Sequence, residues 1–238
     1  MVKNHLKRLS MPKSWLVSRK SNKFIIKPLP GSHNLELSIP LGIILRDYLK
    51  YAETLKEVKL ILNNENIFVN GKKVTSFKYN CGLFDIIEIE KNKEKFIILY
   101  NKVGRVILVN YNSTNLFLKV SNKTILKGGK YSLNFSNGYN ILVDLKTFKT
   151  VKINDTVVFD YKTKKIKDII SFKEGNFLYV FKGNYVGLFG KVLSITKYNG
   201  VSNDLVEIET ENDKVVTSLS NCYMISKNKK DLNLFREK

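Results

Sequence analysis

The sequence has 238 residues, 43% of them hydrophobic, which allows one or two ordinary domains or three small ones. It carries 41 Lys and Arg residues against 21 Asp and Glu, a formal net charge of +20, which indicates a polyanionic partner. The two cysteines are far apart, and no apolar run reaches the roughly twenty residues of a membrane span, which excludes a disulfide framework and predicts a soluble, intracellular protein.

The positive charge is localised, and it comes mostly from lysine. Residues 1–30 contain eight basic residues and no acid, and residues 91–130 contain nine basic residues and one acid. Residues 41–90 are balanced, with seven of each. Lys outnumbers Arg by 36 to 5, which favours point contacts with phosphates over bidentate contacts with base edges.

Residues 1–37 are predicted to form a basic arm. The arm holds three of the four prolines and little periodicity, so we expect it to become ordered only on its partner. Trp15 could stack on a base or a guanidinium, or plug into the neighbouring domain, and we favour the plug. His5 and His33 lack acid or Cys partners at ligand spacing, which indicates polar contacts rather than catalysis or metal binding.

Residues 38–94 are predicted to form a small α/β module. Apolar spacing predicts a helix over 41–52, and T-L-K-E at 54–57 is a capping box that opens a second helix. Asn70-Gly71 predicts a type I′ hairpin, and 85–90 alternates as a strand does. Arg46 and Lys50, four residues apart, would share one helical face that either contacts RNA or is simply the solvated side of the helix.

Three short motifs sharpen this interpretation. They are S-x-P-L at 38–41, L-R-D-x-L-K at 45–50 and V-N-G-K at 69–72. With them the module resembles the alpha-L RNA-binding motif of ribosomal proteins and RNA-modifying enzymes. The resemblance implies that the two helices and the hairpin lie on a folded RNA backbone.

The second half of the chain is predicted to be β-structure. Residues 96–109 read as two strands around a turn at 102–104, and turn clusters separate short β-prone runs up to 150. Another strand pair follows at 152–172, so 95–170 is predicted as an all-β central domain. In 174–195 two strands flank a glycine-punctuated loop, and further strands follow at 203–210 and 215–226.

The glycine-punctuated stretch resembles the KOW motif of small SH3-like barrels. The resemblance implies such a barrel over 171–230, followed by a tail at 231–238. That motif has a cationic residue after its central glycine, whereas this chain has Leu188. The complete expectation is an α+β protein with a basic N-terminal arm, an alpha-L RNA-binding domain, an all-β central domain and a KOW barrel.

The N-terminal stretch adds a resemblance to one family. H-L-K-R-L at 5–9, P-K-x-W at 12–15 and P-x-x-G-x-H at 28–33 occur in the same order in the e-type ribosomal protein four of the small subunit. Similar stretches continue to about residue 227, although VNGKKV replaces the family's V-D-G-K-V-R. The resemblance implies a structural protein of the cytoplasmic ribosome that binds small-subunit rRNA and neighbouring ribosomal proteins.

Catalytic and cofactor motifs are missing from the sequence. It has no phosphate-cradling G-x-x-x-x-G-K-[ST] loop, no zinc-ligand spacing and no histidine outside the arm to serve as a base. We therefore expect no enzyme activity, cofactor, metal or small-molecule substrate. Five aspartates are predicted to occupy strand ends and turns: Asp85, Asp144, Asp155, Asp160 and Asp168.

The sequence is also compatible with two other functions, each of which fits it less well than the ribosomal one. An RNA-modifying enzyme with an alpha-L targeting module would need a catalytic domain that the β middle is too short to supply. A free RNA-binding or transcription factor built on a KOW barrel would not explain the full-length resemblance. The predicted RNA-binding residues are Lys3, His5, Lys7, Arg8, Lys13, Arg19, Lys20, Arg46, Lys50, Lys72, Lys73, Arg105, Lys127, Lys130, Lys182 and Lys191.

Overall fold

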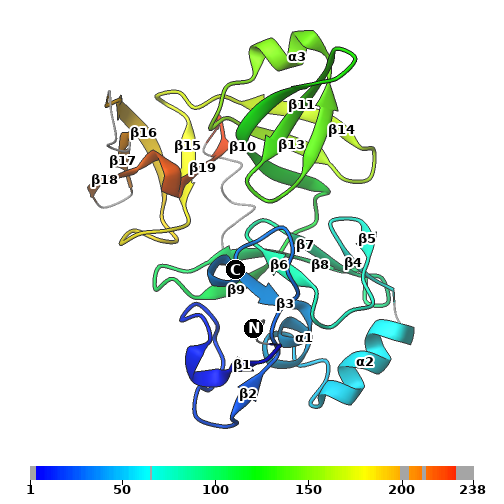
Figure 1. Cartoon of the computed structure of the whole chain (residues 1–238). Coiled ribbons are helices and arrows are strands. Elements are labelled where there is room, and N and C mark those ends of the chain that lie inside the picture. Colours follow the sequence, from blue (N-terminus) through cyan, green and yellow to red (C-terminus); the bar gives the residue numbers. More distant parts are fainter. Residues whose placement is uncertain (1–3, 65, 199–203, 211–212, 229–238) are drawn as a thin grey trace. The chain divides into compact units, whose positions relative to one another are not determined.

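The fold is known from a computed structural model, which describes residues 4–64, 66–198, 204–210 and 213–228. The chain forms two compact units. Unit 1 comprises Met1–Tyr100 and Arg105–Ser113, and unit 2 comprises Asn101–Gly104 and Thr114–Lys238. Antiparallel strands dominate both units and helices are few (Figure 1), which confirms the coarse α+β expectation.

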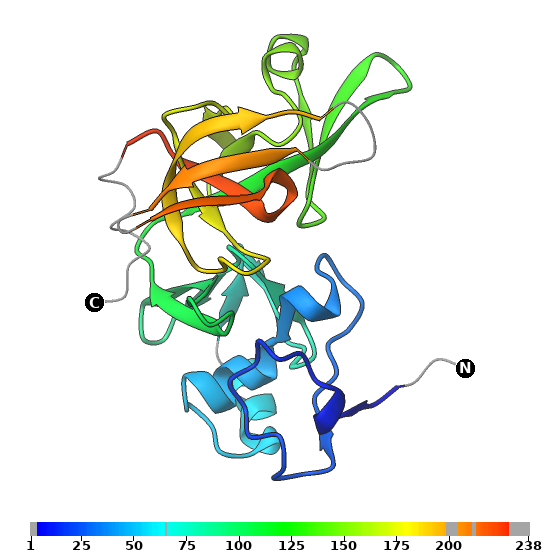
Figure 2. The ribbon, with the colours of Figure 1, turned by 90° about the vertical axis from the view of Figure 1, so that its left-hand side faces the viewer.

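The basic arm packs against the rest of unit 1. Its strands β1 (Leu6–Lys7) and β2 (Phe24–Ile25) pair antiparallel, and it lies beside the helical segment of unit 1 in both views (Figures 1 and 2). Trp15 is 3% exposed, and its Nε1 donates to the Ser38 carbonyl at 2.6 Å. The predicted plug is therefore confirmed. The packing of the arm on unit 1 differs from the expectation that the arm becomes ordered only on its partner.

Two arginines explain how so basic a segment folds back on itself. The Arg8 guanidinium is 5% exposed and donates to the Ser18 carbonyl and to Ser21 Oγ. Arg19 Nη2 donates to the Met11 carbonyl at 3.1 Å. Because the acceptors of both guanidinium groups are neutral oxygens of the arm, the arm folds back on itself without an acidic partner for either arginine.

The first predicted helix is shorter than expected. β3 (Ser38–Pro40) leads into α1 (Leu41–Ile43), which continues as a π-helical turn over Ile44–Tyr48 and not to residue 52. The Leu49 N–H donates to the Ile44 carbonyl at 2.9 Å, the five-residue spacing of a π-turn. Lys50 then takes a left-handed φ of 56°. Arg46 and Lys50 therefore do not share a helical face, and that prediction is wrong.

The second helix, α2 (Leu55–Asn64), begins as predicted. The Glu57 N–H donates to Thr54 Oγ1 at 3.3 Å, and the Glu57 carboxylate accepts the Thr54 N–H at 3.4 Å. The pKa of Glu57 is lowered, mainly because its carboxylate accepts a hydrogen bond from the Glu53 N–H. Hydrogen bonds from Thr54 contribute less to this lowering. Val58 and Leu62 are fully buried, which places the apolar stripe of α2 in the core.

One antiparallel sheet organises the rest of unit 1, in the order β5-β4-β7-β8-β9. Asn70 (φ 53°) and Gly71 (φ 75°) form the predicted turn between β4 and β5. A short strand, β6, pairs with β3. The bounds are β4 (Ile67–Val69), β5 (Lys72–Lys73), β6 (Asn80–Gly82), β7 (Ile86–Ile89), β8 (Glu94–Tyr100) and β9 (Val106–Asn110).

The hairpin of β8 and β9 belongs to this sheet. β8 pairs with β7 through registers such as Ile86 with Ile97, and both of these side chains are buried. The sequence correctly predicts the hairpin and its turn. The predicted start of a central domain at residue 95 falls inside the sheet of unit 1, because β8 completes the buried face that β7 begins.

A buried carboxylate joins the end of the arm to this sheet. Asp85, 2% exposed, accepts from His33 Nε2 at 3.0 Å, Asn70 Nδ2 at 2.8 Å and the Gly82 N–H at 2.7 Å. A Cβ at position 82 would lie 2.3 Å from the His33 ring, so this packing requires glycine. Burial on its own lowers the pKa of His33, but the charge and hydrogen bond of Asp85 outweigh it and raise that pKa above 6.5.

Unit 2 contains two five-stranded antiparallel sheets, in the orders β12-β11-β10-β13-β14 and β18-β17-β16-β15-β19. Glycine-containing turns at 128–129 and 137–138 join β10, β11 and β12 where the sequence predicts them. The bounds are β10 (Asn115–Leu126), β11 (Lys130–Phe135), β12 (Asn140–Val143), β13 (Thr156–Asp160), β14 (Lys165–Ile170), β15 (Phe177–Val180), β16 (Phe189–Thr196), β17 (Leu205–Glu209), β18 (Lys214–Ser218) and β19 (Cys222–Ser226).

One short helix in unit 2 is not predicted by the sequence. α3 (Leu145–Thr150) follows β12, and the ring of its Phe148 lies 4.8 Å from that of Tyr131. Lys123 Nζ lies 4.4 Å from the centre of the Phe148 ring. Six residues are too few to show a helical period, so the turn depends on tertiary contacts rather than on its own pattern.

A buried lysine ties the two sheets of unit 2 together. Lys119 on β10 is 6% exposed, and its Nζ donates to the carbonyls of Leu219 at 3.1 Å, Ser220 at 3.3 Å and Cys222 at 2.8 Å. These acceptors use all three N–H donors of the ammonium. Burial lowers the pKa of Lys119 to about 8, and the nearby Cys222 raises it slightly.

Four of the five aspartates lie at strand ends or between elements, as predicted, whereas Asp168 lies within β14. Asp155 accepts the N–H groups of Lys152 and Phe172, and Asp160 lies 2.9 Å from Lys167 Nζ. The hydrogen bond from Lys167 to the Asp160 carboxylate is the main reason that the pKa of Asp160 is lowered. Asp168 pairs with Lys227, and Asp144 immediately precedes α3.

Replacing His33 should destabilise unit 1 most at low pH. Because Asp85 raises the folded-state pKa of His33, the contribution is full below pH 6.5 and is lost as the pH rises through the folded value. We expect His33→Gln to lower the free energy of unfolding by about 2 kcal/mol at pH 5.5 and clearly less at pH 9. His5→Gln, an exposed control, should change it little. A pH-independent loss in chemical denaturation would contradict the charged pair.

Replacing Lys119 should destabilise unit 2. Lys119→Met leaves three carbonyls without their donor, so we expect a loss of about 2–4 kcal/mol in the free energy of unfolding at pH 7. Since the folded pKa of about 8 lies below the ordinary 10.5, the unfolded parent holds this proton more tightly. The stability of the parent should therefore rise between those two values, and this rise should disappear in the variant.

The exposed Lys127→Met, in the same hairpin, is the matched control for this experiment. It should leave both the stability and its dependence on pH unchanged, because its loss orphans no buried acceptor. If both variants had the same free energy of unfolding and the same dependence on pH, the hydrogen bonds from Lys119 to the three carbonyls would not contribute to stability.

Candidate nucleic-acid interface

Most of the predicted RNA-binding residues lie on the surface. Lys3 lies outside the described residues, as does the predicted tail at 231–238. Arg8 is buried, and Arg19 and Arg46 are half-buried. The exposed members are His5, Lys7, Lys13, Lys20, Lys50, Lys72, Lys73, Arg105, Lys127, Lys130, Lys182 and Lys191.

The three less exposed arginines have internal partners. Arg8 and Arg19 donate to oxygens of the arm itself, as described above. Arg46 Nη2 lies 2.8 Å from Asp47 Oδ2, in a pair formed by adjacent residues. The expectation that Arg46 points freely outward is wrong. Its charge is already balanced by a neighbouring carboxylate.

Three predicted residues from distant parts of the sequence line one hollow. The arm hollow, of about 370 Å³, is lined by Lys13, Arg19 and Arg105 together with Trp15 and residues 16–18. No carboxylate lines it. Three cations in one lining produce a local positive potential, which favours contact with a phosphate backbone.

The position of the arm hollow follows from how the arm attaches to the sheet. The Val106 N–H of β9 donates to the Ser14 carbonyl at 2.8 Å, which places Arg105 beside the arm. The Leu16 N–H donates to the Tyr48 hydroxyl at 2.8 Å. Burial is the main reason that the pKa of Tyr48 is raised to about 12, and the charge of the nearby Arg105 acts in the opposite direction. Tyr48 therefore stays protonated and serves as an anchor for the arm.

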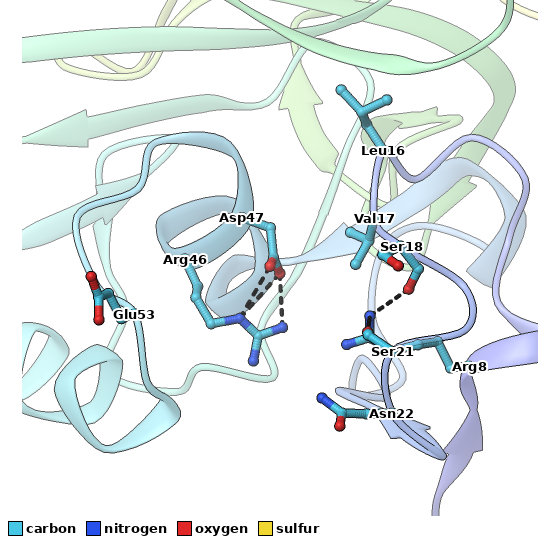
Figure 3. A pocket seen from close by; sticks show the side chains of 9 residues that line it. All are labelled: Arg8, Leu16, Val17, Ser18, Ser21, Asn22, Arg46, Asp47 and Glu53. Carbon is cyan, nitrogen blue, oxygen red and sulfur yellow. Dashed lines mark hydrogen bonds and ion pairs between the residues drawn. The ribbon is translucent and has the colours of Figure 1, made fainter.

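A second hollow, of about 360 Å³, lies between the arm and the helical segment (Figure 3). Arg8 and Arg46 line it, but so do Asp47 and Glu53. Figure 3 shows Arg46 paired with Asp47 and Arg8 bound to Ser18. With two carboxylates against two guanidinium groups, this hollow has no excess of positive charge among its lining residues.

The other predicted residues lie elsewhere on the two units. Lys72 and Lys73 follow the Asn70-Gly71 turn, and Lys73 Nζ donates to Asn66 Oδ1 at 2.6 Å. In unit 2, Lys127 and Lys130 flank the turn between β10 and β11. Lys182 lies in the loop between β15 and β16, and Lys191 lies on β16 opposite Glu209. None of these six lines the arm hollow.

Sequence reasoning missed a group of lysines that lie over phenylalanine rings. Lys23 Nζ lies 5.5 Å from the centre of the Phe24 ring. Lys59 and Lys78 lie 5.2 and 5.7 Å from that of Phe77. In the sequence, the signal for these contacts is the adjacency of Lys and Phe at 23–24 and 77–78. The contribution of Lys59 becomes visible only when α2 folds toward residue 77.

The described residues offer little for metal or thiol chemistry. They contain no group of three or more His, Cys, Asp or Glu side chains that could hold a metal ion. Cys81 and Cys222 are both buried and unbridged, and burial raises the pKa of both thiols, to about 12 for Cys222. In the described part of the chain, no helix is long and apolar enough to cross a membrane.

Comparison with known protein families gives two matches along the chain. Residues 2–36 match the RS4NT (NUC023) domain, and residues 92–166 match the Ribosomal family S4e. The first match covers most of the basic arm. The second covers the β8–β9 hairpin of unit 1 and the first sheet of unit 2 up to β14.

Individual relatives match over most of their length. Small ribosomal subunit protein eS4 of Methanococcus aeolicus is 35% identical over 216 residues, 88% of each chain. The eS4 protein of Archaeoglobus fulgidus is 33% identical over 232 residues, 97% of each chain. The crystal structure of the 30S ribosomal protein S4e from Thermoplasma acidophilum superposes with a TM-score of 0.69 at 31% identity, covering 81% of this chain and 97% of that one. The chain therefore belongs to the eS4 family of small-subunit ribosomal proteins.

Proposed function

We infer that this chain is a structural constituent of the small ribosomal subunit that binds and organises rRNA. The observation that carries this conclusion is the 33% identity to an eS4 protein over 97% of both chains. The ribosome of the cytoplasm is the location that this role implies.

The surface chemistry supports contact with a phosphate backbone. Twelve of the predicted cationic or imidazole side chains are exposed, and ten of these twelve are lysines. The arm hollow gathers Lys13, Arg19 and Arg105 without a carboxylate. Since lysine binds phosphate as a point charge, we propose that the protein recognises the shape of a folded RNA rather than its base sequence.

We also propose how the chain is divided into modules. The helical segment, α2 and the Asn70-Gly71 hairpin support an alpha-L module, which we extend from residue 38 to Asn110 because β8 and β9 complete its sheet. The strands β15 and β16, with their glycine-containing loop, support a KOW barrel over 171–230. Neighbouring ribosomal proteins are the expected second class of partner.

Catalysis is not part of this role, because proteins of the eS4 family are structural components of the ribosome. The aspartates that could be considered as catalytic candidates form structural hydrogen bonds and ion pairs instead. Asp85 accepts the Gly82 N–H and the His33 ring N–H. Asp155 accepts the N–H groups of Lys152 and Phe172, and Asp160 pairs with Lys167.

Binding to small-subunit rRNA should depend steeply on salt. Each lysine that neutralises a phosphate releases a counterion, so the logarithm of the affinity should fall linearly with the logarithm of the salt concentration. If six to ten phosphates are contacted, the affinity should fall by about 10³–10⁵ between about 50 and 200 mM salt. Filter binding to purified rRNA measures this slope. A flat response would contradict binding through phosphates.

Reversing charges in the arm hollow should weaken RNA binding without unfolding the protein. Lys13→Glu with Arg105→Glu replaces two exposed cations on one wall, so we expect at least a tenfold loss of affinity, about 1.4 kcal/mol. The control is Lys164→Glu with Lys165→Glu, the same charge change at exposed positions in unit 2. Equal losses in both variants would mean that net charge, rather than the arm hollow, governs binding. Thermal melting checks that both variants stay folded.

A further inference from the structure

A third hollow in unit 1 combines apolar walls with cations. The hairpin hollow, of about 360 Å³, lies where the β1–β2 hairpin of the arm faces the stretch at 77–78. Four cationic side chains line it, and none of its lining residues is acidic. This composition differs from the balanced hollow of Figure 3, although both share the wall formed by Arg8. The four cations are Arg8, Lys27, Arg46 and Lys78.

Aromatic rings line the same hollow. Phe24 is 48% exposed, and its ring meets the His5 ring edge to face at 5.2 Å. Phe77 contributes another wall, with Lys59 and Lys78 over its ring. A half-exposed phenylalanine held in place by a second ring offers a flat face to a planar partner.

Arg8 brings a buried positive charge to this wall. Its side chain is 5% exposed, and its Nε, which is buried, has no hydrogen-bond partner in the described part of the chain. Its Nη1 donates to the Ser18 carbonyl and to Ser21 Oγ, both of which are neutral acceptors. Among the described residues no carboxylate pairs with Arg8. A buried cation without a counter-ion favours an anion supplied from outside.

We propose that the hairpin hollow binds one unpaired nucleotide of an RNA, with its base stacked on Phe24 and its phosphate attracted by Arg8 and the surrounding lysines. This proposal rests on the proposed function and names the part of the RNA that this surface takes. The base supplies the flat apolar face, and the phosphate supplies the negative charge. A nucleotide in a regular duplex cannot enter, because its base is stacked and paired inside the helix.

Other occupants fit the hollow less well. An acidic peptide would satisfy the cations but would leave the aromatic face of Phe24 without a planar partner. An apolar helix would cover the rings, but it would also cover the charged groups of the hollow without supplying an anion, which is costly. The polar side chains of Asn4 and Asn22, also in the lining, can donate to and accept from a base edge.

Tryptophan fluorescence tests the stacking directly in the full chain. Phe24→Trp places an indole on the rim, while the native Trp15 is buried and contributes a constant background. A short single-stranded RNA should quench the new fluorescence. A blunt-ended duplex RNA with the same number of phosphates, which has no unpaired nucleotide, should quench it far less. Phe24→Ala should weaken binding of the single strand about tenfold, within the range of one base–aromatic stack, and change duplex binding by less than about twofold.

Leu60→Trp is the matched control. Leu60 is 58% exposed on α2, lies next to Lys59 and four residues after Lys56, and does not line the hollow. It should show no preference between the two RNAs. Phe24→Ala should melt at the parent temperature, because the side chain it removes is half-exposed.

The outcomes separate this proposal from the proposed function. Equal quenching by both RNAs at position 24, or none by either while salt-dependent binding persists, would overturn the nucleotide site and leave the ribosomal role intact. Failure of the parent chain to bind either RNA would overturn both. Co-sedimentation of Phe24→Ala with small subunits, combined with loss of protection of one unpaired base against chemical modification, would support both.

Discussion

Unit 1 depends on the buried carboxylate of Asp85. Its oxygens accept donors from the end of the arm, from the Asn70-Gly71 turn and from the last residue of β6. Its own backbone N–H and carbonyl bond to Gly82 and to Ile98 of β8. Asn70 Oδ1 in turn accepts the Ile86 N–H at 2.8 Å. A buried charge is tolerated only when its lone pairs are occupied, so these distant segments must come together for the unit to fold.

Arginine and lysine have different uses in this chain. Three of the five arginines, Arg8, Arg19 and Arg46, are bound to oxygens of unit 1, where a planar group with several donors can satisfy more than one acceptor. Most of the named lysines are exposed, and Lys119 is the buried exception, with a carbonyl for each of its N–H donors. Composition alone indicates a basic surface but cannot show which cations are already engaged. Three arginines therefore stabilise the fold of unit 1, whereas most of the named lysines lie at the surface.

The elements that the sequence predicts correctly are those whose signals are local. The Thr54–Glu57 capping box, the Asn70-Gly71 turn and the glycine turns of unit 2 each depend on residues within a few positions of one another. The errors arise where tertiary contacts decide. The helix at Leu41 becomes a π-turn and ends before Lys50, although its apolar spacing continues. The β8–β9 hairpin was recognised, but the sheet that it joins depends on pairing with β7, which no local pattern shows.

The candidate site shows the same division. Exposure of the lysines follows from their chemistry, whereas the gathering of Lys13 with Arg105 needs the bond between Ser14 and Val106 that brings the arm to β9. The formal net charge of +20 opposes compaction of the free protein. Hydrogen bonds from Arg8 and Arg19 to neutral oxygens hold the arm against that repulsion, and RNA that binds the folded form would relieve it further. If RNA binds the arm as we propose, stability and RNA affinity are coupled, because a change that loosens the fold of the arm would also move apart the cations that line the arm hollow.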